Sequence, residues 1–255
     1  MFPFQKSLSS QHPNNISKEA PQQPTTIMPS TESLLDPQDT FATLCTSVGL
    51  DIRLRKGLSR LGYIRPTLVQ SKCLPLAITS GRDLLVRART GSGKTLAYCL
   101  PILHKILAKE NDEESEGFVQ AVILVPTREL CTQVTKTLNS LIYYCDEVVS
   151  VATLFSGKNS SESSLVQQEA MLRDEPDVLV STPAGLLAHI KRDGSLLKTS
   201  LKLSVESLVV DEADLVLSFG TLLSYAVYAM FTEFSTMSHS NLSLLQDMQM
   251  MSLRL

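Results

Sequence analysis

The residues with the most distinctive chemistry form a glycine-bearing stretch, Ala88-Arg89-Thr90-Gly91-Ser92-Gly93-Lys94-Thr95. It follows an apolar run, Leu84–Val86, which is typical of a strand, and it precedes Leu96–Leu107, which is typical of a helix. Glycines let the backbone pass close to an anion with its N–H groups pointing inward, and the start of the following helix adds a dipole that favours phosphate. We therefore predict a phosphate-binding loop. Its nucleotide-binding residues would be Thr90, Gly91, Ser92, Gly93, Lys94 and Thr95.

Two side chains at the end of this stretch have defined roles in such a loop. Lys94 would place its ammonium on the β- and γ-phosphates, and Thr95 would place its hydroxyl on Mg²⁺. Ala88 stands where the general pattern has its first glycine. The alternative is a surface turn that carries a lysine, but a strand before the turn and a helix after it are the context that a phosphate-binding loop requires.

An acidic pair supplies the second half of the predicted site. Asp211 and Glu212 directly follow an apolar run, Leu208–Val210. Asp211 would bind Mg²⁺, directly or through water, and Glu212 would orient the attacking water and act on it as a general base. The alternative is a helix start whose acidic residues interact with the helix dipole. Together with Lys94, these two carboxylates form the predicted catalytic set.

The elements that must position these residues alternate along the chain. Apolar runs typical of strands lie at 84–86, 118–125, 148–155, 177–180 and 205–210, and runs typical of helices lie at 96–107, 128–144, 160–172 and 184–190. This alternation predicts an α/β fold with a parallel sheet and helices on both faces. Ligands bind at the carboxyl ends of the strands in such sheets, so the fold can bring Lys94 and Asp211 together.

The residues before the loop have the spacing of helices. Apolar positions in 40–62 suit short amphipathic helices. A further helix is predicted from Pro66-Thr67 to about Ile78, with a bend at Pro75 and an end at Gly81.

The two ends of the chain differ from its middle. Residues 1–38 hold six of the twelve prolines and no glycine, and they show no apolar periodicity, so we predict a disordered tail rich in Ser, Pro and Gln. Residues 221–255 hold five of the eight methionines and lack Gly and Pro; 222–234 could form a helix, but strands that would complete a domain are not evident. We expect one domain at 39–220, followed by a divergent tail that is either a truncated end or a segment that packs on the sheet.

Several motifs occur in an order that resembles one family. They are Gly62-Tyr63-x-x-Pro66-Thr67-x-x-Gln70, the loop at 88–95, Pro126-Thr127-Arg128-Glu129-Leu130, Thr182-Pro183 and Asp211-Glu212-Ala213-Asp214. Jointly they resemble the DEAD-box ATP-dependent RNA helicases, whose version of the loop carries an alanine in its first position. The resemblance covers residues 40–220 and implies a P-loop NTPase fold, the first RecA-like helicase domain. A second such domain follows in the family and is expected to be absent here, so we interpret the chain as C-terminally truncated.

The resemblance also implies an adenine site. Gln70 would read the adenine edge, since an amide can donate and accept in a bidentate pair, and Thr67 would support it. An upstream aromatic stacks on adenine in the family, and Phe41 is the candidate, although it lies about four residues further from Gly62 than is usual. A core position for Phe41 and a helix start at Pro66-Thr67 are the alternatives.

RNA contacts follow from the same resemblance. The residues implied are Pro126, Thr127, Arg128, Gly157, Thr182 and Pro183. Thr127 and Arg128 would grip the RNA backbone, which positions the strand without reading its sequence; their alternative is an ordinary exposed helix start. Ala184-Gly185 stands where the family has Gly-Arg, so one cation facing RNA is missing.

The expected function is ATP-dependent RNA strand separation, with ATP and Mg²⁺ as cofactors and RNA as partner. Leu215–Gly220 and Leu68-Val69 resemble the nucleolar DBP9-like subgroup, which implies the nucleolus within the nucleus, pre-ribosomal RNA and ribosome assembly proteins. Two alternatives stay open: a non-catalytic nucleotide- or RNA-binding fragment that competes with the full-length helicase, and an unrelated phosphate-loop ATPase.

Composition adds little to this picture. A net charge of −3 does not by itself indicate a nucleic-acid binder, although a local basic face would suffice. The five cysteines form no Cys-x-x-Cys pair and the four histidines have no metal-binding spacing, so we predict buried thiols in a reducing compartment. No apolar run reaches the length of a membrane span and no secretion signal is seen, so no membrane partner is expected.

Overall fold

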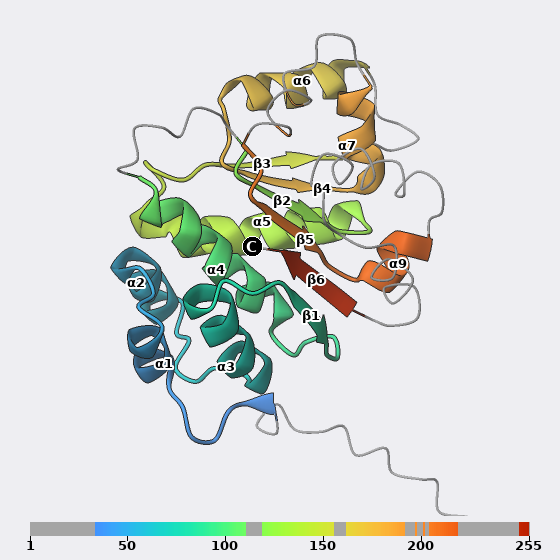
Figure 1. The fold of residues 1–255 in the computed structure, drawn as a ribbon. Helices are drawn as coiled ribbons and strands as arrows, with labels where there is room; N and C mark the ends of the chain where they lie inside the picture. The colour runs from blue at the N-terminus through green and yellow to red at the C-terminus, as the bar shows by residue number, and fades with distance from the viewer. Residues whose placement is uncertain are drawn as a thin grey trace, which may run out of the picture. The chain divides into compact units, whose positions relative to one another are not determined.

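A six-stranded sheet organises the chain (Figure 1). The computed structural model describes residues 34–110, 119–155, 162–191, 197, 201, 204–218 and 250–254. The strands are β1 Leu84–Arg87, β2 Ala121–Leu124, β3 Val151–Leu154, β4 Val178–Ser181, β5 Ser207–Val210 and β6 Met250–Arg254, in the spatial order β1-β6-β5-β2-β4-β3. Strands β5, β2, β4 and β3 pair in parallel, which confirms the predicted α/β class.

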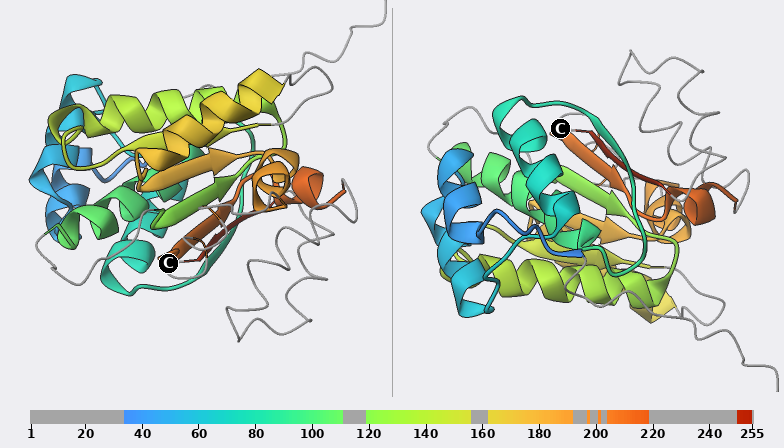
Figure 2. Two further views of the ribbon diagram at one scale, coloured as in Figure 1. Left: turned by 90° about the horizontal axis from the view of Figure 1, so that it is seen from above. Right: turned by 90° about the horizontal axis from the view of Figure 1, so that it is seen from below.

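Helices cover both faces of the sheet. They are α1 Phe41–Ser47, α2 Ile52–Arg60, α3 Leu68–Leu74, α4 Lys94–Ala108, α5 Arg128–Leu141, α6 Glu162–Arg173, α7 Pro183–Ile190 and α9 Ala213–Ser218. Side chains alternate along a strand, so Ile123 packs with α4 and α5 in one core cluster, whereas Val122 and Leu124 pack with α7 in the other. Figure 1 shows α6 and α7 above β3 and β4 and shows α4 and α5 below them, and Figure 2 views the chain from these two sides.

Strand β6 differs from the sequence prediction. Residues 250–254, for which no strand was expected, lie between β1 and β5 and are antiparallel to both. Two strands that carry the predicted site residues therefore depend on a segment from the far end of the chain for their shared hydrogen bonds. This placement matches the alternative in which the tail packs on the sheet. The predicted helix at 222–234 lies outside the described residues.

The helix before the phosphate-binding loop changes type at Pro75, where a bend was predicted. Thr67 caps α3, and a π-helical turn, Pro75–Thr79, continues it. Pro75 lacks a backbone N–H and so cannot donate the regular helical hydrogen bond, which accounts for the change of helix type. Gly81, at φ +56°, ends the segment. Pro66 lies just before the cap, outside the helix.

The described chain begins within the segment expected to be a tail. The Asp36 N–H donates to the Pro66 carbonyl at 2.9 Å, and Leu35 forms an isolated bridge with Thr67. The Arg65 guanidinium also donates to the Asp36 carbonyl. Residues 34–38 thus belong with the folded residues that precede α3.

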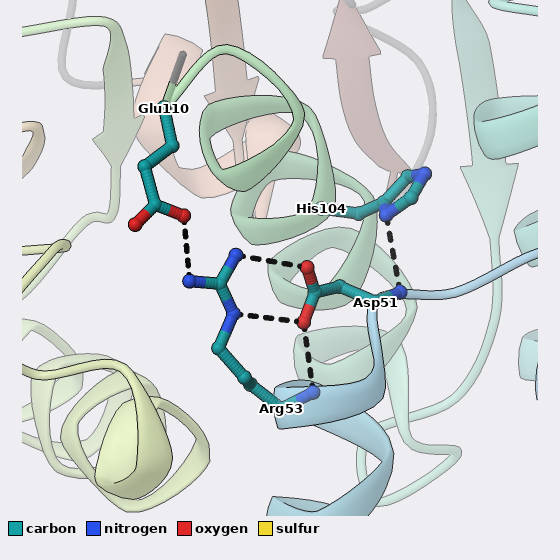
Figure 3. Close-up of polar contacts among 4 residues, drawn as sticks. All are labelled: Asp51, Arg53, His104 and Glu110. Atoms are coloured by element: carbon teal, nitrogen blue, oxygen red, sulfur yellow. Dashed lines mark hydrogen bonds and ion pairs between the residues drawn. The ribbon is translucent and has the colours of Figure 1, made fainter.

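A polar network holds α2 against α4 (Figure 3). The Arg53 guanidinium donates to both carboxylate oxygens of Asp51, at 3.1 and 3.0 Å, and to Glu110 at 2.6 Å. The Asp51 N–H donates to Nδ1 of His104, on α4, at 3.2 Å. Because α4 begins at the phosphate-binding loop, this network helps to fix the direction of the helix that follows the loop.

Candidate nucleotide-binding site

The glycine-bearing loop joins β1 to α4, as predicted. Gly91 and Gly93 have φ values of +78° and +84°, a left-handed backbone that glycine adopts without strain. Gly93 caps α4 without a side-chain hydrogen bond. The Ser92 hydroxyl is buried and finds no hydrogen-bond partner among the residues that the structure describes. An unsatisfied buried donor beside unpaired helix amides suits a phosphate oxygen, so this loop fits ATP.

Lys94 is held by the loop itself. Its ammonium donates to the Ala88 carbonyl at 2.7 Å and to the Arg89 carbonyl at 3.1 Å. Carbonyl oxygens are neutral acceptors, and a charged phosphate oxygen is a stronger one. Lys94 can therefore exchange these contacts for phosphate when nucleotide binds.

Asp211 is the buried carboxylate of the site, 8% exposed at the end of β5. Its Oδ1 accepts the Glu212 N–H at 2.9 Å, and its Oδ2 accepts the Tyr98 hydroxyl at 3.0 Å. Burial raises the pKa of Asp211 above 3.8, while the hydrogen bonds and the Lys94 charge oppose this shift. Tyr98 was not among the predicted site residues, because a tyrosine in an apolar helix reads as core.

Glu212 has a different environment from its neighbour. It is partly exposed, and its φ of +50° is unusual for a residue with a side chain. Burial is the largest cause that raises the pKa of the Glu212 carboxyl. The negative charges of Asp211 and Asp214 raise this pKa further, and the positive charge of Lys94 lowers it. Strained backbone of this kind often occurs at functional sites. The role of Glu212 as general base stays a prediction.

Helix α4 joins the two halves of the site. It begins at Lys94, and its Tyr98 donates to Oδ2 of Asp211 at 3.0 Å, so the tertiary fold brings the loop and the acidic pair together. No cluster of three or more His, Cys, Asp or Glu side chains suited to a metal exists among the described residues. Mg²⁺ usually takes one or two carboxylates plus substrate phosphates, so Asp211 and Thr95 fit that role together with ATP.

Gln70 is packed against the loop. It is 2% exposed; its Oε1 accepts the Thr67 N–H at 2.8 Å and its Nε2 donates to the Gly93 carbonyl at 3.0 Å. Thr67 and Gln70 also form the capping box of α3. Each amide atom of Gln70 keeps one further hydrogen-bonding position, so the adenine role remains a prediction.

The prediction for Phe41 needs correction. Phe41 is 4% exposed and its ring packs edge-on against Tyr63, with ring centroids 6.0 Å apart. A ring that is buried in the core has no exposed face on which a base could stack. Phe41 therefore occupies the core position that was the alternative to the adenine-stacking role. Phe41 belongs to the buried apolar face of α1 together with Leu44 and Cys45.

The predicted RNA residues separate into two groups. Thr127 caps α5, and Arg128 is exposed with its guanidinium 3.9 Å from the centroid of the Phe155 ring. Pro126, just before them, is partly exposed. This group presents a cation to solvent at the start of a helix, and its members keep the RNA role as a prediction.

The second group is mainly structural in this fold. Thr182 and Pro183 are buried at the start of α7, where the Thr182 hydroxyl accepts the Gly185 N–H. A Cβ at Gly185 would lie 2.7 Å from the Phe155 Cα, so close packing of α7 on β3 explains a glycine there. Gly157 lies outside the described residues.

Two general expectations can be compared with the structure. The five cysteines are free and buried, and burial raises the pKa of Cys45 to about 11, which keeps its thiol protonated at neutral pH. None of the helices in the described ranges combines the length and the apolar character that crossing a bilayer requires.

Comparison with known proteins identifies the family. The sequence profile of the DEAD/DEAH box helicase family matches residues 67–241, which is more than half of the chain and extends beyond Gly220, where we expected the resemblance to end. The "Probable ATP-dependent RNA helicase ddx56" of Dictyostelium discoideum is 45% identical over 187 residues, 73% of this chain and 25% of that protein. The ATP-dependent RNA helicase DBP9 of Candida albicans is 38% identical over 193 residues, 76% of this chain and 31% of that protein.

A solved structure supports the fold alone. The yeast DEAD-box splicing factor Prp28 superposes with a TM-score of 0.65 at 24% identity, over 84% of this chain and 50% of that chain. The chain spans between 25% and 31% of the length of the two helicases above. The profile match over residues 67–241 shows that the chain belongs to the DEAD/DEAH box helicase family.

Proposed function

We propose that this chain is the ATP-binding part of a DEAD-box RNA helicase, which binds Mg–ATP and RNA and couples ATP hydrolysis to local separation of RNA strands. One observation carries the proposal: the Tyr98 hydrogen bond to Asp211 joins α4, the helix that begins at Lys94, to the acidic pair at the carboxyl end of β5. Phosphate binding and water activation need these groups in one place.

The residues of the site have distinct roles in this reaction. Lys94, Ser92 and the loop amides bind and orient the phosphates. When bound with ATP, Mg²⁺ neutralises charge on the phosphate oxygens, and Thr95 and Asp211 would hold it. Glu212 accepts a proton from the attacking water, and its raised pKa makes it a stronger base than an ordinary glutamate.

RNA binding is assigned to the exposed start of α5. Arg128 and Thr127 would contact RNA phosphates there, which makes the interaction independent of base sequence and sensitive to salt. Gln70 would give selectivity for adenine through its remaining donor and acceptor positions.

The relatives support a narrower assignment. Similarity to the DBP9 and ddx56 helicases supports pre-ribosomal RNA as substrate, ribosome assembly proteins as partners and the nucleolus as location. Because the chain spans a minor part of these relatives, strand separation is proposed for the whole protein to which this part corresponds. The arginines that a second domain would supply accelerate phosphoryl transfer by several orders of magnitude, so hydrolysis by this chain alone should be slow.

The test is ATP hydrolysis by the purified chain with and without RNA. RNA-stimulated hydrolysis that is lost in Lys94→Ala and Glu212→Gln supports the proposal. The second candidate, a non-catalytic nucleotide-binding fragment, rests on the small share of the related helicases that this chain spans, 25% and 31% of their length. It would show a rise in melting temperature with Mg–ATP but no hydrolysis in any variant. Equal affinity for GTP and ATP would contradict the role of Gln70.

A further inference from the structure

Tyr98 places a hydroxyl group on the buried face of α4. It lies on α4, is wholly buried, and donates a hydrogen bond to Oδ2 of Asp211 at 3.0 Å, across 113 residues of sequence. A buried hydroxyl has a desolvation cost unless it is paired, and a phenylalanine of nearly the same size would fill the space without that cost. Packing alone therefore does not account for the oxygen of Tyr98.

A second residue of the site lies close to Tyr98 along the helix. Thr95 lies one turn before Tyr98 on the same face of α4. Burial, with the charges of Cys99 and Asp211, raises the pKa of Tyr98 well above 10.0. The phenol thus remains a protonated donor toward Asp211 at any physiological pH.

We propose that Tyr98 is a positioning residue for the divalent cation, because its phenol donates to Asp211 and lies one turn along α4 from Thr95, and these are the two side chains that are expected to bind Mg²⁺. This inference rests on the proposed Mg–ATP function. Tyr98 does not touch the nucleotide or the cation. It acts through Asp211, whose other oxygen is held by the Glu212 N–H at 2.9 Å. The carboxylate is therefore oriented from both sides before a cation arrives.

The experiment removes the hydroxyl and keeps the ring. In Tyr98→Phe, the affinity for a fluorescent ADP analogue is measured while free Mg²⁺ is titrated. Loss of a partner that orients a metal ligand lowers metal affinity by about tenfold or more, so the midpoint of the Mg²⁺ titration should rise by at least about tenfold. Affinity for the analogue without Mg²⁺ should be unchanged. Tyr143→Phe is the matched control, since it removes a hydroxyl from a side chain that is 55% exposed.

The outcomes separate the inference from the proposed function. An unchanged Mg²⁺ midpoint in Tyr98→Phe overturns the inference, as does a loss of affinity that is equal with and without Mg²⁺, because both would mean a structural role only. If Mg²⁺ has no effect on nucleotide affinity in the unaltered chain, the proposed Mg–ATP function fails instead.

A second measurement does not depend on how well the variant folds. The chain has six tyrosines and no tryptophan, so its near-ultraviolet absorption reports mainly on phenols. Mg²⁺ added to the ADP complex of the unaltered chain should perturb this band, because a cation on Asp211 withdraws charge from the carboxylate that accepts the Tyr98 hydrogen bond. A phenol band that does not change on Mg²⁺ binding would contradict the link.

Discussion

Two glycines of the phosphate-binding loop allow backbone strain to be separated from a tertiary contact. Gly91 and Gly93 have nearly equal φ values, +78° and +84°. A Cβ added at Gly91 would meet nothing within 4 Å, whereas one added at Gly93 would lie 2.4 Å from Nε2 of Gln70 and 3.0 Å from Oγ1 of Thr67. Alanine at these positions should therefore have the same backbone cost and a different packing cost.

The magnitudes follow from the contacts. Left-handed backbone costs an alanine about 1–2 kcal/mol, so Gly91→Ala should lower the free energy of unfolding by that amount. In Gly93→Ala, Gln70 must move and lose its 3.0 Å hydrogen bond to the Gly93 carbonyl. Leaving a buried polar group without its partner costs about 1–3 kcal/mol more. The total for Gly93→Ala is then about 2–5 kcal/mol.

The assay is urea unfolding of the nucleotide-free chain, followed by circular dichroism and compared at constant m-value. Both substitutions are repeated in a Gln70→Ala background, in which the closer of the two crowding side chains is gone and Thr67 remains. There, the excess loss of stability in Gly93→Ala over Gly91→Ala should shrink. Equal losses for the two glycines in the unaltered chain, or a Gly93→Ala loss that Gln70→Ala does not reduce, would refute the reasoning.

Three other predictions concern sites away from the loop. Burial lowers the pKa of the His104 imidazole below 6.5, and the charge of Asp51 opposes this shift. The free energy of unfolding should therefore fall as the pH is lowered from 6.5 through the pKa of the folded state. Urea midpoints measured over this pH range should change less in His104→Gln. Phe155→Leu removes the ring under Arg128, a contact of about 0.5–2 kcal/mol, and should weaken RNA affinity, whereas Phe155→Tyr should retain it; equal loss in both variants would contradict the role of the ring. Deleting residues 250–255 leaves facing edges of β1 and β5 unpaired, so the cooperative transition in circular dichroism should disappear; a persisting transition with the same midpoint would show that β6 is dispensable.

The local patterns of the sequence were sufficient for the class of fold and for the core of the site. Strand β2 was expected at 118–125 and lies at Ala121–Leu124, and the helix changes type at Pro75, where the N–H is missing. The loop at 88–95 was predictable because its glycines, its lysine and the flanking elements are contiguous. Asp211 could be placed beside Lys94 because parallel strands all end at one edge of the sheet.

The tertiary structure decided what depends on residues far apart in sequence. Phe41 resembled an adenine-stacking residue, but Tyr63 and the core cover it. Tyr98 looked like an ordinary core residue until the fold brought its hydroxyl to Asp211, 113 residues away. The sequence of β6 did not predict a strand, yet β6 lies between β1 and β5 in the sheet. Periodicity reports which face of an element is apolar, whereas the partner of a buried polar atom or of an unpaired strand edge is set only when distant segments pack together.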